Sequence, residues 1–153
     1  MPRKTQFTAE DIVQAAIELV RKQGLAKLSA AAVAEEMGSS TMPIYSYFAT
    51  MDEFRVAILF RAWEIPRGYI SKSYTGDIWV DHGIGYVLFA RDHSQIFNCM
   101  QYGRLQEIRD CRLRFWEFAS SQLENYPAFE GLSAEHVGWI RHLRSLLTHG
   151  IAV

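Results

Sequence analysis

A run of uncharged side chains near the N-terminus combines hydroxyl groups with apolar surface. Hydroxyls both donate and accept hydrogen bonds, and thioether and ring carbons pack against other apolar groups. This combination suits the base edges and thymine methyls that the major groove of DNA presents. The side chains concerned are Thr41, Met42, Pro43, Tyr45, Ser46 and Tyr47.

Histidine and cysteine, which could support other chemistry, are scattered along the chain. None of the five histidines has a Cys, Asp or second His four residues later, so no metal-ligand pattern is present. Cys99 and Cys111 form no CxxC motif and are expected to be ordinary buried thiols in a reducing compartment. There is also no glycine-rich phosphate loop or nucleophile elbow. The sequence therefore predicts no enzyme, metal site or cofactor.

Two short helices joined by a tight turn are expected to position the uncharged run. Ser29 can cap the first helix, and Gly38 can end it in the left-handed conformation. The second helix is predicted from near Thr41 to near Phe48, because Pro43 is tolerated only in a first turn. This arrangement is typical of a helix-turn-helix, whose second helix enters the major groove.

Helical patterns surround this pair. Thr8 caps a predicted helix over Ala9 to about Gln23, and Thr50 with Glu53 reads as a capping box that opens a fourth helix. A polar stretch over residues 70–77 is interpreted as the connection to the rest of the chain. Further helices are expected around residues 80–88, between Gly103 and Pro127, and after Ser133. No segment has the alternation of a strand, so the fold is predicted to be all-α.

Charge and spacing alone leave the function open. Residues 1–55 carry six Lys or Arg against seven Asp or Glu, whereas DNA-binding domains normally present a basic patch. A short helix pair with a glycine turn also occurs in many proteins, where Tyr45, Tyr47 and Phe48 would only be core aromatics.

The two stretches that form the helix pair resemble a known family. Leu28-Ser-Ala-Ala-Ala-Val-Ala-Glu-Glu-Met-Gly38 followed by Ser39-Ser-Thr-Met-Pro-Ile-Tyr-Ser-Tyr-Phe48 is similar to the signature of TetR/AcrR transcriptional regulators. The resemblance implies an N-terminal three-helix DNA-binding domain followed by a helical ligand-binding and dimerisation domain. It implies that Thr41, Met42 and Pro43 face bases, that Tyr45 and Tyr47 hold phosphates, and that Ser29 presents a hydroxyl and a helix N-terminus to the backbone.

One position departs from the family pattern. The family has a phosphate-binding lysine at the start of the fourth helix, where this chain has Met51. We expect Lys27 and the basic tail to supply part of what is lost, the tail by reaching a minor groove, and the salt dependence of binding to be shallow. The complete set of expected DNA contacts is Arg3, Lys4, Lys27, Ser29, Ser40, Thr41, Met42, Pro43, Tyr45, Ser46 and Tyr47.

The second half of the chain resembles one subgroup of these regulators less closely. Residues 86–100 are similar to a helix ending Phe-Ala that is followed by a turn and another helix, with Ser94 in place of the subgroup's proline. Residues 146–150 are similar to its aromatic-x-x-His-Gly element without the tryptophan. Aromatic and Met side chains are candidates for an effector pocket; the alternative is that most of them are simply core. They are Trp79, Tyr86, Phe89, Phe97, Met100, Phe115, Trp116 and Phe118.

The resemblance implies two domains, a DNA-binding head over residues 1–50 and a helical effector and dimerisation domain over residues 51–153. The expected function is that of a homodimeric, sequence-specific regulator that represses transcription until a small molecule releases it from operator DNA. The alternative is a helical ligand-binding or scaffold protein that no longer binds DNA, which the neutral head and Met51 favour.

Two further expectations concern the ends and the location of the chain. The start lacks a signal peptide's apolar block and no segment is long enough to span a membrane, so a cytoplasmic protein is expected. The chain ends at Val153 after an apolar sequence without a capping residue. Either it is truncated there, or its dimer interface is smaller than is usual in the family.

Overall fold

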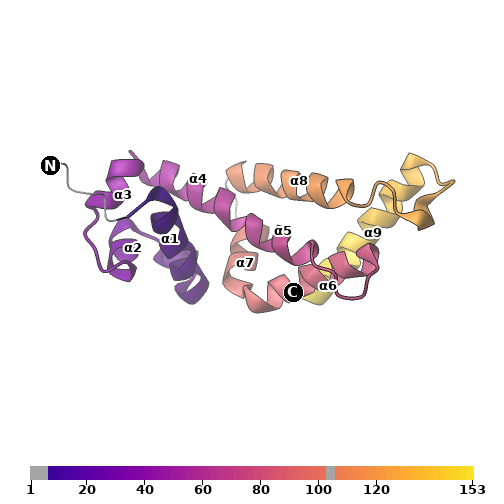
Figure 1. Cartoon of the computed structure of the whole chain (residues 1–153), viewed down its shortest axis with the longest axis horizontal. Helices are drawn as coiled ribbons and strands as arrows, with labels where there is room; N and C mark the ends of the chain where they lie inside the picture. The colour runs from indigo at the N-terminus through magenta and orange to yellow at the C-terminus, as the bar shows by residue number, and fades with distance from the viewer. Residues whose placement is uncertain (1–6, 103–105) are drawn as a thin grey trace. The chain divides into compact units, whose positions relative to one another are not determined.

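The computed structural model describes residues 7–102 and 106–153, and within these ranges every regular element is a helix (Figure 1). The all-α prediction is therefore confirmed. The helices are α1 (Ala9–Gln23), η1 (Leu25–Lys27), α2 (Ala30–Glu36), α3 (Met42–Tyr47), α4 (Met51–Ala62), α5 (Glu64–Ile70), α6 (Ile78–Asp92), α7 (Ser94–Tyr102), α8 (Gln106–Ser121), η2 (Pro127–Phe129) and α9 (Ala134–Ala152).

Internal contacts divide the chain into two compact units. The first unit runs to Trp63 and also takes in Gln95–Cys111, so it contains α1 to α4, most of α7 and the start of α8. The second unit consists of Glu64–Ser94 and Arg112–Val153, which hold α5, α6, most of α8 and α9. The polar stretch after Ile70 joins α5 to α6, both of which belong to the second unit.

The first unit is built around α1, which contacts α2, α3 and α4 (Figure 1). The Thr8 side chain accepts a hydrogen bond from Asp11 N, and the Asp11 carboxylate accepts one from Thr8 N, so the predicted helix start is confirmed as a capping box. One side of α1 is apolar and almost completely buried. Its core partners from the other three helices include Val33, Ile44 and Phe54, which are at most 1% exposed.

The start of α4 differs in one detail from the predicted capping box. Thr50 caps the helix as expected, because its side chain accepts a hydrogen bond from Glu53 N. The Glu53 carboxylate, however, accepts from Ala49 N at 2.8 Å and not from the backbone of the cap. The Glu53 side chain thus holds the link between α3 and α4 at Ala49. In a capping box it would bind the backbone N–H of the next residue, the cap itself.

The buried face of α6 in the second unit differs from the face that its aliphatic residues suggest. Val80 is 43% exposed and Ile84, Val87 and Leu88 are only half-buried, whereas Tyr86 and Phe89 are buried. The reason is a close approach between backbones: a Cβ added to Gly85 would lie 2.4 Å from the Tyr69 carbonyl oxygen of α5. The glycine therefore sets which side of α6 meets α5.

Replacing Gly85 by Ala is expected to destabilise the protein by about 3 kcal/mol, because the backbone of α5 has to shift to admit the methyl group. Gly83 on the same helix is the matched control, since its added Cβ would meet only the Thr148 hydroxyl oxygen, at an ordinary 3.9 Å. Urea unfolding of both variants measures the difference. Equal stabilities of Gly85→Ala and Gly83→Ala would contradict this packing.

The last helix, α9, packs against α6 with its polar side. Arg141 donates to the Leu123 carbonyl and Arg144 donates to the Trp79 carbonyl, both at 2.9 Å. Ser133 caps the helix, which confirms the predicted start. No helix within the described ranges combines the length and the apolar composition needed to cross a membrane.

Candidate nucleic-acid interface

The turn between α2 and α3 is fixed by a glycine in the left-handed conformation. Gly38 has φ of +61°, donates to the Glu35 carbonyl at 3.0 Å, and is followed by a bond from Ser39 N to the Ala34 carbonyl at 2.8 Å. These two bonds form the Schellman motif, which confirms the predicted helix stop at Gly38. The motif ends α2 abruptly and allows the chain to turn into α3 after only a few residues.

The helix α3 buries one side and exposes the other. Ile44 is 1% exposed and anchors the helix in the core of the first unit. Met42 is 77%, Tyr45 51% and Tyr47 43% exposed, which is unusual for such large side chains. The six residues of α3 therefore present an apolar and aromatic surface to the solvent, with Thr41 and Pro43 half-buried beside it.

Some of the candidate hydroxyls already have partners within the protein. The Ser46 hydroxyl donates to the Pro43 carbonyl at 2.6 Å, and the Tyr47 hydroxyl donates to the Phe7 carbonyl at 3.2 Å. Ser29 accepts from Ala32 N at 3.2 Å as the N-cap of α2. The Thr41 side chain makes no capping bond, and the Tyr45 hydroxyl has no hydrogen-bond partner among the described residues. Thr41 and Tyr45 are thus the hydroxyls best placed to meet another molecule.

Most cations of α1 to α4 are neutralised by neighbouring carboxylates. The ion pairs are Arg21 with Glu18, Lys22 with Glu36, Arg55 with Asp52 and Arg61 with Glu10. Within the described part of this region, Lys27 is the one cation without an ion pair, and it is exposed at the end of η1. The surface around α3 therefore carries little positive charge that could attract phosphates.

The sequence was compared with known families and the fold with solved structures. Residues 12–58 match the family of bacterial regulatory proteins called the tetR family. Residues 12–58 are therefore a TetR-type DNA-binding domain. The matched segment contains α2, α3 and the turn between them, so the TetR-family resemblance seen in the sequence is confirmed.

The fold of the whole chain is also similar to that of a solved TetR-family protein. This protein is a TetR-family transcriptional regulator from Haemophilus influenzae, with a TM-score of 0.56 and 18% sequence identity. The similarity covers 94% of each chain. No curated protein sequence matches. The chain is thus a DNA-binding transcriptional regulator with an N-terminal helix-turn-helix and a helical remainder.

The start of α4 is where this chain departs from the TetR-family pattern. Met51 occupies the position of the expected lysine and is half-buried in the first turn of α4. Its neighbours Asp52 and Glu53 are exposed and acidic, so the first turn of α4 offers phosphate no cation in place of the lysine. Of the cations expected to compensate, Lys27 is exposed, whereas Arg3 and Lys4 lie outside the described residues.

One contact between the helix-turn-helix and its supports was not predicted. The rings of Phe48 and Phe54 lie 4.9 Å apart across the Thr50 cap, and Phe54 is completely buried. Together with the bond from Tyr47 to the Phe7 carbonyl, this contact fixes the end of α3 to α4 and to the segment before α1. The spacing of Phe48 and Phe54 around the cap was the only signal for it in the sequence.

The candidate effector-binding side chains divide between the two units. Phe97 and Met100 belong to the first unit, and both are buried. In the second unit a cavity of about 20 Å³ holds no more than about one water molecule. Tyr86, Phe115 and Trp116 line it, while Trp79 stacks on Tyr126, Phe89 is 1% exposed, and Phe118 lies under the Arg67 guanidinium.

The polar side chains of the second unit are engaged in structural contacts. His82 is buried and its Nε2 lies 2.8 Å from the Gln122 amide oxygen; burial lowers the pKa of this imidazole. Asp81 accepts hydrogen bonds from Thr75 N and Oγ1, both at 2.7 Å, and so holds the loop before α6. No group of three or more His, Cys, Asp or Glu side chains suits a metal ion among residues 7–102 and 106–153.

Proposed function

We propose that this TetR-family regulator is a homodimeric repressor that reads operator DNA with the exposed face of α3 and leaves it when a small molecule binds. The observation that carries the proposal is the exposure of Met42 and Tyr45 on a helix anchored by Ile44. These large apolar side chains are exposed to solvent and have no partner among the described residues of the first unit. The base edges of a DNA duplex supply one.

Each candidate contact is assigned by its exposure and its existing bonds. Thr41, Met42 and Pro43 lie at the start of α3, the end that enters the major groove in a helix-turn-helix, and contact base edges. Tyr45 extends from the exposed side toward a phosphate. The positioning contacts come from the end of α3 and from the chain around the two helices, namely Arg3, Lys4, Lys27, Ser29, Ser40, Ser46 and Tyr47.

The dimer forms through the outer side of α9. A stripe of large apolar side chains at helical spacing is exposed there, with Trp139 59%, Leu143 61% and Leu147 67% exposed. The apolar side of a helix normally faces the core, but in α9 the side with Arg141 and Arg144 faces the rest of the second unit. A second copy of the same stripe, packed against the first, buries both.

A homodimer is also consistent with the short recognition helix of the DNA-binding head. One recognition helix of six residues spans only a half-site, and specificity arises when a symmetric pair reads two half-sites. The functional division that we propose is a DNA-binding head over residues 1–50 and an effector-binding and dimerising part over residues 51–153. Bound over a promoter, such a dimer represses by occupying the site.

Selection of binding sites from a pool of random duplexes tests this proposal. The dimer is expected to enrich an inverted repeat whose half-sites lie one helical turn apart or a multiple of it. Enrichment of one unpaired half-site would contradict the dimer, and the absence of any enriched sequence would favour a helical scaffold that does not read DNA.

The salt dependence of binding provides a second prediction. Lys27→Ala is expected to make the slope of log K against log salt shallower by about 2 for a dimer, because each copy loses one released counterion. Lys22→Ala is the matched control, since Lys22 is already paired with Glu36. Anisotropy titrations at several salt concentrations measure both slopes. An unchanged slope for Lys27→Ala would show that Lys27 contacts no phosphate.

A further inference from the structure

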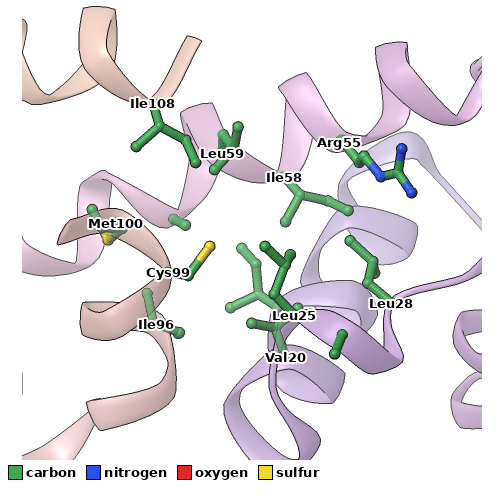
Figure 2. A pocket seen from close by; sticks show the side chains of 13 residues that line it. Val20, Leu25, Leu28, Arg55, Ile58, Leu59, Ile96, Cys99, Met100 and Ile108 are labelled. Carbon is green, nitrogen blue, oxygen red and sulfur yellow. The ribbon is translucent and has the colours of Figure 1, made fainter. Parts of the chain in front are cut away.

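The first unit contains an apolar cavity of about 550 Å³, well within the range of small-molecule sites (Figure 2). Protein interiors contain few voids larger than a water molecule, and an empty apolar cavity is destabilising. The size and the apolar lining of this space are those of a small-molecule binding site. It is lined by Ile17, Val20, Leu25, Ala26, Leu28, Arg55, Ile58, Leu59, Ala62, Ile96, Cys99, Met100 and Ile108.

The chemistry of the lining determines the class of ligand. Among the described residues that line the cavity, Arg55 alone carries a charge, and in Figure 2 its guanidinium points away from the other lining side chains. It is bound to Asp52 at 3.0 Å on the surface, so it offers the cavity its aliphatic stem. The Cys99 sulfur points from α7 into the space between the lining side chains (Figure 2), and burial raises the pKa of this thiol, which keeps it uncharged.

Several residues that line the cavity belong to the elements that hold α2 and α3 in place. Leu25 and Ala26 belong to η1, and Leu28 immediately precedes Ser29, the N-cap of α2. On the opposite side, Ile58 belongs to α4, the helix whose Phe54 packs against Phe48 at the end of α3. A molecule in the cavity thus touches both elements that fix the orientation of α2 and α3.

We propose that this cavity binds an uncharged, largely apolar small molecule, and that its occupancy lowers the affinity of the regulator for operator DNA. The proposal rests on the proposed function, for which it names the effector class and the site. Of the side chains predicted from sequence to bind the effector, only Met100 lines this cavity. The site lies within the first unit, beside the DNA-binding helices, and a ligand there acts on α2 and α3 without a distant relay.

Binding of N-phenyl-1-naphthylamine, a neutral aromatic probe whose fluorescence rises in apolar surroundings, tests the site. We expect saturable binding of one probe per chain. Ala26→Trp at the mouth and Cys99→Phe in the wall should each weaken binding at least tenfold, because the larger side chains fill the cavity. Circular dichroism and thermal unfolding check that the variants fold.

The chain provides a matched control for Ala26→Trp. Ala128 is also an exposed alanine in the middle of a three-residue 3-10 helix, but it lies in η2 of the second unit and does not line the cavity. Ala128→Trp should leave probe binding unchanged. Equal binding by the wild type and Ala26→Trp, or no binding at all, would overturn the proposal.

Alkylation gives a second readout that does not depend on fluorescence. Iodoacetamide labelling followed by mass spectrometry distinguishes Cys99, which lines the cavity, from Cys111, which is buried elsewhere. Saturating probe should slow labelling of Cys99 at least fivefold and leave that of Cys111 unchanged. Equal effects on the two thiols would contradict binding at this site.

The effect on DNA binding is measured separately from probe binding. Saturating probe should weaken operator binding by the wild type at least fivefold and that of Ala26→Trp not at all. Probe binding without this change would refute the coupling. A protein that binds the probe but shows no selectivity for DNA in the absence of probe would refute the proposed function and leave the ligand site standing.

Discussion

Leu143→Glu combined with Leu147→Glu is expected to convert the dimer into a monomer and to reduce operator affinity more than a hundredfold. These side chains are 61% and 67% exposed in the single chain, and a symmetric dimer buries four of them. Complete burial of a fully exposed leucine stabilises by about 1.5–3 kcal/mol, and about two thirds of this gain is available at each of the four side chains. At least about 4 kcal/mol of association free energy is therefore lost before charge repulsion is counted. Analytical ultracentrifugation measures the state of association.

A matched substitution separates the interface from a general effect of added charge. Ile78 is also an exposed aliphatic residue, but it lies at the start of α6, where an acidic residue is favourable. Ile78→Glu should therefore leave both the dimer and operator binding intact. A dimer that persists in the Leu143→Glu, Leu147→Glu variant would exclude α9 as the interface, whereas dissociation of Ile78→Glu as well would show that charge alone is responsible.

The second large effect is expected at Tyr45. Tyr45→Ala should weaken operator binding by about 1–3 kcal/mol per half-site, because the side chain contacts DNA. Its thermal stability should change little, since the side chain is 51% exposed and has no hydrogen-bond partner among the described residues. Anisotropy with operator DNA measures the affinity, and calorimetry measures the stability.

Two further variants distinguish the parts played by the tyrosines. Tyr45→Phe keeps the ring and removes the hydroxyl, so the loss in affinity divides between stacking and the phosphate bond. Tyr47→Phe removes the bond to the Phe7 carbonyl and should act on stability more than Tyr45→Phe does. Equal losses of stability and affinity for Tyr45→Ala would mark Tyr45 as a packing residue and contradict its role at the interface.

The helix ends of the first unit were predictable because their signals are local. Thr8 with Asp11, Ser29 with Ala32 and Gly38 with Glu35 each interact within three residues, so the sequence order alone contains the pattern. The uncharged composition of α3 is equally local. These local features are sufficient to predict the helix-turn-helix without any tertiary contact.

The faces of the later helices depend on contacts that sequence order does not contain. In α9, Arg141 and Arg144 turn inward because they reach carbonyls that lie 18 and 65 residues away. In α6, both sides are apolar, and the close approach of Gly85 to Tyr69 decides which side is covered. Periodicity predicts that these helices exist, but it cannot predict which side finds a partner.

The cavity was missed for a related reason. Its lining comes from five helices and a connector, and contacts between residues far apart in sequence place them together. Most of its side chains are small aliphatic residues that read as ordinary core. Aromatic side chains, by contrast, are conspicuous in the sequence, and the predicted set therefore included Trp79 and Phe115, both in the second unit.

Fluorescence anisotropy on the DNA that flanks the gene of this protein, compared with a scrambled duplex at two salt concentrations, tests the central claim most directly. The account predicts selective binding by two chains per site, with a preference for the flanking DNA that persists at the higher salt because α3 reads it without charge. Equal binding to both duplexes by a folded dimer would contradict the claim that the exposed face of α3 reads DNA.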